Sequence, residues 1–177
     1  MPPAEFLRTF TNKKVNTIFV KDFKQCWYQQ GLLGLSDSIQ ETVEIIKKQL
    51  PENQKNIYTI GTSAGGYAAI LFGALLGADK IVAFAPQTIL TKPIFRKFKS
   101  LESKQGDIDF DGEFANLKKL LETLDFKGSI HIHYGQKNLI DKAEAEHLAH
   151  LQFVHLHPWE TNSHVIAGWL KKQDKLN

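Results

Sequence analysis

The sequence lacks three features that are typical of secreted or membrane proteins. Cys26 is its single cysteine, so an internal disulfide is excluded. No apolar run approaches the roughly 18 residues that a membrane-spanning helix needs. The first ten residues lack the basic and apolar stretches of a secretory signal. We therefore expect a cytoplasmic protein with no membrane partner.

The chain also lacks a strong charge of either sign. It carries 22 basic and 19 acidic residues, for a net charge of +3 at pH 7. A balance this even gives no basic surface for nucleic acid or an anionic membrane, and it leaves small-molecule substrates open. With 177 residues, 42% of them hydrophobic, residues 1–177 are expected to form a single domain.

Segments typical of strands and helices alternate along the chain. The predicted strands are 17–22, 56–60, 80–86, 129–134 and 151–157, and the predicted helices are 36–50, 62–77, 114–124, 141–150 and 164–173. This alternation predicts an α/β fold with a mostly parallel sheet of about five or six strands flanked by helices. Residues 87–112 contain no firm element and are expected to form a lid or a substrate-binding loop.

The segment Gly61-Thr62-Ser63-Ala64-Gly65 follows a predicted strand and opens a predicted helix, as a G-x-S-x-G nucleophile elbow does. Its glycines are expected because a side chain on either side of the serine would collide with its neighbours. The pattern predicts Ser63 as a catalytic nucleophile, with the Ala64 backbone N–H stabilising an oxyanion.

A serine nucleophile needs a histidine base that is held by a carboxylate, and in this fold both follow it in the chain. His164 is the predicted base, because it lies in a polar loop between the last strand and the last helix. Asp141 is the predicted acid, because it opens the helix after the fourth strand, and Asn138 is the alternative. Glu144 and Glu146 are expected to face solvent from that helix.

Four other histidines lie in pairs on two neighbouring predicted strands, at positions 131, 133, 155 and 157. Alternate residues of a strand share a face, so a metal site that bridges the strands is conceivable. No acidic or cysteine ligand accompanies them, and we predict that no metal or organic cofactor is used.

Several segments resemble a bacterial group of the α/β-hydrolase superfamily that is often encoded near surface-glycan or secretion genes. They are IYTIGTSAGGYAAILFGALLGADKIVAFAPQT, FVKDFKQCWYQQGLLGL, HYGQKNLIDKAEAEHL and NSHVIAGWL, which together cover most of residues 15–173. The resemblance implies a second oxyanion N–H from the loop that follows residues 17–22, at Phe23 or Lys24. It also implies that Trp27 and Tyr67 bind substrate.

Typical α/β-hydrolases have a further strand upstream of residues 17–22, and only about sixteen residues precede that segment here. We therefore expect a shortened α/β-hydrolase fold. If successive helices cover mainly one face of a short sheet, apolar surface is left on the other face, which favours a homodimer.

These features predict a serine hydrolase that cleaves an ester or thioester through an acyl-enzyme on Ser63, with a small-molecule acyl substrate. An acyltransferase that uses the same intermediate has the same sequence pattern. The alternative from another class is a non-catalytic α/β-hydrolase-like binding or accessory protein, related to surface glycans or secretion.

Overall fold

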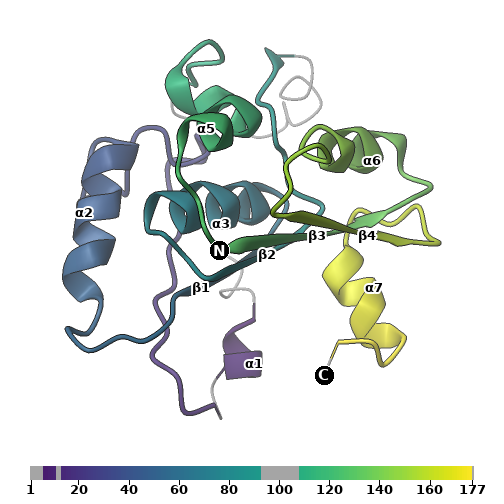
Figure 1. Ribbon diagram of the computed structural model, residues 1–177, viewed down its shortest axis with the longest axis horizontal. Coiled ribbons are helices and arrows are strands. Elements are labelled where there is room, and N and C mark those ends of the chain that lie inside the picture. Colours follow the sequence, from purple (N-terminus) through teal and green to yellow (C-terminus); the bar gives the residue numbers. More distant parts are fainter. Residues whose placement is uncertain (1–5, 11–12, 93–107, 177) are drawn as a thin grey trace.

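The computed structural model describes residues 6–10, 13–92 and 108–176, and its centre is a parallel four-stranded sheet (Figure 1). The strands are β1 (Tyr58–Thr62), β2 (Lys80–Phe84), β3 (Ser129–Gly135) and β4 (Val154–Trp159). They lie side by side in chain order, β1-β2-β3-β4. The predicted α/β class and parallel sheet are confirmed, with fewer strands than expected.

The connecting helices lie on one face of the sheet (Figure 1). They are α3 (Ala64–Leu75), α5 (Leu117–Thr123), preceded by the short 3-10 helix η2 (Glu113–Ala115), and α6 (Leu139–Glu146). Because each strand is added on the same side of the previous one, right-handed crossovers must all pass over the same face. The buried side chains of the strands on this face are aliphatic, as shown by Ile81, Ile130 and Ile132, each with an exposed fraction of 0%.

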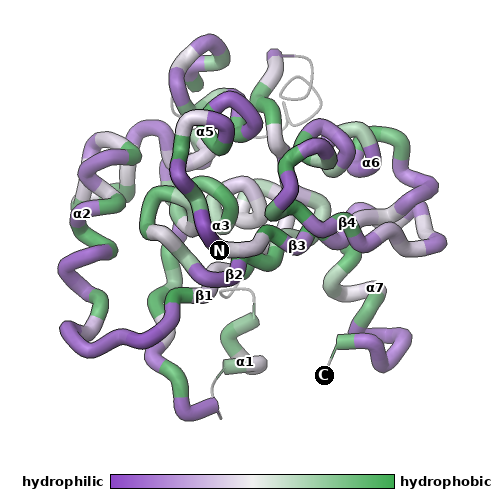
Figure 2. The backbone as a smooth tube through the Cα atoms, viewed as in Figure 1, coloured by the Kyte–Doolittle hydropathy of each residue, from purple (hydrophilic) through white to green (hydrophobic). Residues whose placement is uncertain are grey.

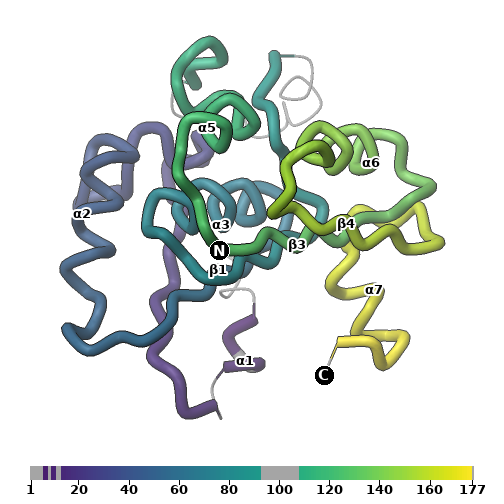
Figure 3. Tube along the Cα trace, viewed as in Figure 1, coloured from purple at the N-terminus to yellow at the C-terminus, as the bar shows by residue number. Residues whose placement is uncertain are grey.

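Two helices from opposite ends of the chain lie on the other face (Figure 3). They are α1 (Leu7–Phe10) and α7 (Ile166–Lys172). The Phe6 ring, just before α1, lies 5.7 Å from the Phe84 ring of β2. Ile166 and Leu170 of α7 are buried in the same cluster as Phe84, so this face has a small aromatic core of its own.

Helix α2 (Ile39–Gln49) lies beside the β1 end of the sheet (Figure 1). Its first turn is capped by the Ser38 side chain, which accepts from Glu41 N, while Glu41 Oε2 accepts from Asp37 N at 2.8 Å. Figure 2 shows α2 with mixed hydrophilic and hydrophobic residues, in contrast to the largely hydrophobic α3. Helix α3 is therefore the buried centre of the molecule, and α2 is amphipathic.

One predicted strand is wrong. Residues 17–22 run in an extended course but belong to no strand of the sheet. Ile18 and Phe19 are exposed by 44% and 41%, and Val20 alone of this stretch packs against the main core. Apolar and β-branched composition gave the expectation, but the segment forms no backbone ladder, which is what defines a strand.

Within the described ranges, no helix combines the length and the apolar character that crossing a membrane would require. The predicted lid falls largely on residues 93–107, which lie outside the described residues.

Candidate active site

Ser63 lies on a sharp corner between β1 and α3. Its backbone has φ 50° and ψ −120°, a conformation that costs a non-glycine residue energy and that clusters at functional sites. Hydrogen bonds hold the corner on both sides, since Ser63 N donates to Phe84 O at 2.9 Å and Tyr67 N donates to Ser63 O at 3.0 Å. The geometry is that of the nucleophile elbow expected from the sequence.

The glycines of the elbow differ in whether a side chain would fit in their place. A Cβ on Gly61 would lie 2.0 Å from Gly65 O, so this position can hold no side chain. A Cβ on Gly66 would lie 3.1 Å from the Pro86 side chain, a tight contact. A Cβ on Gly65 would meet nothing within 4 Å, so the expectation that Gly65 is required by collision is wrong.

The structure brings together the three side chains predicted to carry the chemistry. His164 Nε2 lies 3.0 Å from Ser63 Oγ, and His164 Nδ1 lies 2.9 Å from Asp141 Oδ1. Ser63 follows β1, Asp141 lies in the first turn of α6 after β3, and His164 lies in the loop after β4. The carboxyl ends of parallel strands meet at one edge of the sheet, and this brings three distant segments into contact.

The electrostatics of the three groups suit proton transfer. Asp141 is 4% exposed, and its hydrogen bond to His164 raises the pKa of that imidazole, although burial acts in the opposite direction. If Nδ1–H donates to the carboxylate, Nε2 must accept from the Ser63 hydroxyl in the neutral imidazole. The serine proton therefore points to the atom that would receive it.

Asn138, the alternative acid, has a different role. It caps α6, and its Oδ1 accepts from Ile140 N at 3.2 Å and from Asp141 N at 3.3 Å. The side-chain oxygen is thus engaged with the helix and holds the backbone of Asp141. Asp141 lies inside the first turn, because the helix begins at Leu139, two residues earlier than expected.

Glu144 is buried, so the expectation that it faces solvent is wrong. Its Oε2 accepts from Thr88 N at 2.6 Å, from Thr88 Oγ1 at 2.8 Å and from Ile89 N at 3.1 Å. Burial raises the pKa of Glu144, and the bonds from Thr88 and Ile89 partly oppose that rise. Glu144 ties α6 to the chain that leaves β2.

The remaining predicted site residues are placed as follows. Ala64 begins α3, where backbone N–H groups have no partner within the helix. The Phe23 side chain is 52% exposed. Tyr67 is fully buried and its hydroxyl donates to Phe114 O at 2.8 Å, so its side chain packs in the core, and its contact with substrate stays a prediction.

Trp27 and Gln87 form a polar link to the serine. Trp27 is 7% exposed, and its Nε1 lies 3.4 Å from Gln87 Oε1. Gln87 Nε2 lies 3.4 Å from Ser63 Oγ. From the sequence, Gln87 was expected only as the first residue of a lid. The available signal was its position just after β2, the strand that neighbours the elbow strand, because the ends of neighbouring parallel strands meet.

The four paired histidines are stacked and do not converge on a common point. His133 and His157 have ring centroids 4.4 Å apart at an interplanar angle of 12°, and His131 stacks on both His155 and His157. His131 Nδ1 lies 3.0 Å from His157 Nε2, so these two ring nitrogens are engaged with each other. In the part of the chain that the structure describes, no group of three or more histidine, cysteine, aspartate or glutamate residues could hold a metal.

The parallel sheet, the helices that cover it and the strained elbow are features of an α/β-hydrolase-like fold. Comparison with solved structures finds similar folds. The capsule O-acetyltransferase of Neisseria meningitidis serogroup A matches 76% of this chain at 22% identity with a TM-score of 0.56. The chain spans 61% of the length of that protein.

Two further solved structures are similar. One is a histidine-to-alanine mutant of the same O-acetyltransferase in complex with CoA, with a TM-score of 0.56 at 22% identity over 76% of this chain and 62% of that chain. The other is a lipase-esterase related protein from Clostridium acetobutylicum, with a TM-score of 0.48 at 16% identity over 78% of this chain and 74% of that chain. No family model matches the chain, and no curated protein matches it significantly.

Proposed function

We propose that the protein is an acyl-transfer enzyme that forms an ester between Ser63 and the acyl group of an ester or thioester. The observation that carries the proposal is the continuous contact from Ser63 Oγ to His164 Nε2 at 3.0 Å and from His164 Nδ1 to Asp141 Oδ1 at 2.9 Å. A serine on a strained elbow, a histidine base and a buried carboxylate are the groups that nucleophilic acyl transfer requires.

The first half of the reaction acylates the enzyme. Ser63 Oγ attacks the carbonyl carbon, its proton passes to His164 Nε2, and the carbonyl oxygen becomes an oxyanion. Asp141 stabilises the imidazolium, and the Ala64 N–H, at the positive end of α3, donates to the oxyanion. When the carbon–oxygen or carbon–sulfur bond breaks, the leaving group takes the proton from His164.

The second half removes the acyl group. Water gives its proton to His164 and attacks the ester carbon, and the Ser63–acyl bond breaks as His164 returns the proton to Ser63 Oγ. An alcohol in place of water gives acyl transfer to a new ester with the same proton movements. The serine hydrolase predicted from the sequence and an O-acyltransferase therefore differ only in the second acceptor.

Labelling of the purified protein with a fluorophosphonate tests this function without knowledge of the substrate. We expect the wild type to label and both Ser63→Ala and His164→Ala to lose labelling. Tyr58→Phe is a control, because Tyr58 is the exposed first residue of β1 and its hydroxyl accepts a hydrogen bond from Asn56 Nδ2. A folded wild type that does not label would overturn the proposal in favour of a non-catalytic binding protein.

Transfer to a sugar hydroxyl is the second candidate function, and the likeness to a capsule O-acetyltransferase solved with CoA favours it. The test offers acetyl-CoA with and without oligosaccharide acceptors and measures free CoA and acetylated sugar. Release of CoA only with an acceptor would support transfer. Release at the same rate with water alone would support hydrolysis.

A further inference from the structure

We propose that the side-chain amide of Gln87 is a catalytic hydrogen-bond donor that stabilises the oxyanion beside Ser63, and that Trp27 fixes its orientation. The inference rests on the proposed acyl-transfer function. It assigns the second oxyanion donor to a side chain, where the sequence resemblance implied the backbone of Phe23 or Lys24.

Gln87 is placed at the reacting atom by the topology of the sheet. It follows β2, the strand that pairs directly with the elbow strand in the register Thr62↔Phe84. Its side chain is buried, with 6% exposed, and Nε2 lies 3.4 Å from Ser63 Oγ. A buried amide aimed at a nucleophile keeps its donor strength because little water competes for it.

The amide orientation follows from the chemistry of Trp27. An indole Nε1–H can only donate, so the Gln87 atom that faces it, 3.4 Å away, must be the carbonyl Oε1. The NH₂ group must then face Ser63. The hydrogen bonds acquire one direction, in which Trp27 donates to Gln87, Gln87 to Ser63 and Ser63 to His164.

The length of the contact favours a role in the transition state. Ordinary N–H···O bonds are about 2.9–3.0 Å long, so at 3.4 Å the amide is weakly engaged with the resting serine oxygen. An oxyanion donor should lie within bonding distance of the oxyanion, which one carbon atom separates from Oγ, and should bind Oγ itself less well. Such contacts are often long before substrate binds.

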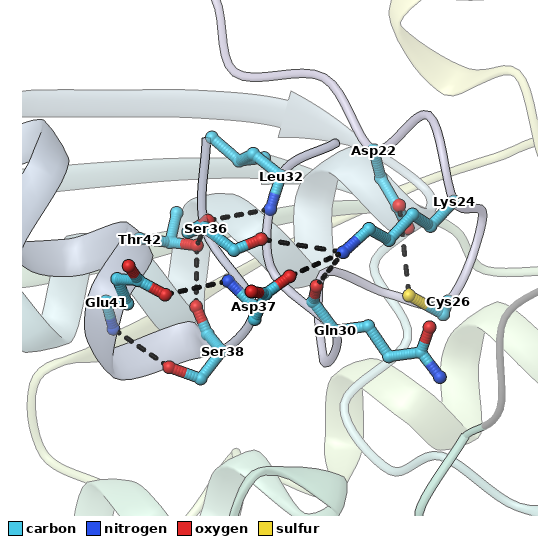
Figure 4. Close-up of polar contacts among 10 residues, drawn as sticks. All are labelled: Asp22, Lys24, Cys26, Gln30, Leu32, Ser36, Asp37, Ser38, Glu41 and Thr42. Carbon is cyan, nitrogen blue, oxygen red and sulfur yellow. Dashed lines mark hydrogen bonds and ion pairs between the residues drawn. The ribbon is translucent and has the colours of Figure 1, made fainter. Parts of the chain in front are cut away.

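The loop that carries Trp27 is held by its own polar network (Figure 4). Lys24 donates to Gln30 O, Ser36 O and Asp37 Oδ1. These bonds join the start of the loop to its end. The backbone of Trp27 adopts a left-handed conformation with φ 51°. This fixed loop holds the indole in place, so it can select one amide orientation.

The backbone that follows Gln87 is held by Glu144. Thr88, the next residue, donates from both its N–H and its hydroxyl to Glu144 Oε2. The backbone next to Gln87 is thus anchored to α6, while the Gln87 side chain contacts the Trp27 loop. A donor fixed before the reaction costs no reorganisation when charge develops, and this gives oxyanion donors their large effect.

The test measures the rate of fluorophosphonate labelling, because phosphonylation of serine also places a charged oxygen in the oxyanion site. Gln87→Met keeps the volume and removes the donor, and we expect labelling to slow about 10²- to 10³-fold. Gln136→Met makes the same change at an exposed glutamine and should label like the wild type. Trp27→Phe keeps an aromatic ring and loses the N–H, so its labelling rate should lie between those of the wild type and Gln87→Met.

A second variant separates donation from simple packing. Gln87→Glu puts a carboxylate beside the oxyanion, so labelling should be suppressed where that group is ionised. The labelling rate should recover as pH falls, because the protonated carboxyl can donate a hydrogen bond. Each rate is divided by the wild-type rate at the same pH, which corrects for the loss of neutral His164. Gln87→Met should show no such recovery, and thermal unfolding should show that both variants are folded.

The outcomes distinguish this inference from the function on which it rests. If the wild type does not label, the acyl-transfer function fails. If the wild type labels and Gln87→Met labels at the same rate, Gln87 is not the donor and the function stands. If Gln87→Met slows labelling but Gln87→Glu shows no recovery in acid, a packing role explains the loss and the donor role is overturned.

Discussion

Two groups of histidines in this protein have opposite electrostatic environments. His164 lies against the buried carboxylate of Asp141, which raises its pKa. The stacked histidines of β3 and β4 lie against one another and against Trp159, and burial lowers the pKa of His133 to about 4. Burial acts on both groups, and only the first has an anion to oppose it.

The comparison explains why one histidine is suited to accept a proton. We call His131, His133, His155 and His157 the histidine ladder. The ladder shares strands with an aliphatic face, since Ile130 and Ile132 alternate with its members along β3. A protonated imidazole there would meet other imidazoles, while at His164 it meets a carboxylate. A proton on His131, His133 or His157 is therefore opposed, and a proton on His164 is stabilised.

The largest effect should come from removing the anion at His164. In Asp141→Asn we expect fluorophosphonate labelling to slow about 10³- to 10⁴-fold, because the amide leaves the imidazolium unsupported and permits the wrong tautomer. The pH inflection of labelling should lie above 6.5 in the wild type, since the pKa of His164 is raised, and should move down in the variant. Labelling at the wild-type rate with an unmoved inflection would contradict the pairing.

The next largest effect is a loss of folding stability in acid, caused by protonation within the histidine ladder. The folded pKa of His133, about 4, lies below the ordinary value of 6.5, so the folded state binds fewer protons than the unfolded state. The contribution of neutral His133 to folding stability is complete above about pH 6.5 and is lost as the pH falls toward 4. The full shift corresponds to about 3 kcal/mol, and partial exposure of the ring reduces our expectation to about 1–2 kcal/mol.

Denaturant unfolding at pH 7 and pH 4.5 measures this loss. His133→Phe keeps an aromatic ring in the stack with Phe84, 5.0 Å away, and cannot be protonated. The free energy of unfolding of this variant should fall less between the two pH values than that of the wild type. An equal fall in both proteins would show that protonation of His133 does not cause the loss.

A smaller effect is expected from giving the ladder the anion that it lacks. His155 is exposed and pairs with His131 across β3 and β4. In His155→Asp, the pKa of His131, now lowered by burial and by neighbouring imidazoles, should rise because a carboxylate stands opposite it. Titration of the imidazole by NMR measures the change. His155→Asn is the matched control, and an equal pKa in both variants would contradict the explanation.

Local patterns in the sequence predicted much of the site but could not predict every contact. The elbow, His164 and Asp141 stand beside recognisable strand ends, and the parallel sheet gathers those ends. The burial of Glu144 could not be predicted, because its donors, Thr88 N and Ile89 N, lie more than fifty residues away. Residues 17–22 have the composition of a strand, but pairing depends on which neighbour the backbone meets.

The smallest effect is expected from Lys175, a cation that lies over the tryptophan rings beside the histidine ladder. Lys175 Nζ lies 5.0 Å from the Trp159 ring centre and 5.9 Å from that of Trp169, and Trp159 Nε1 donates to His133 Nδ1. A cation over a ring face is stabilised by the ring's own charge distribution, so it needs no carboxylate. Lys175→Gln should lower the free energy of unfolding at pH 7 by about 0.5–1 kcal/mol. Lys172→Gln, at the nearby end of α7, is the control, and equal losses in the two variants would mean that the rings contribute nothing specific.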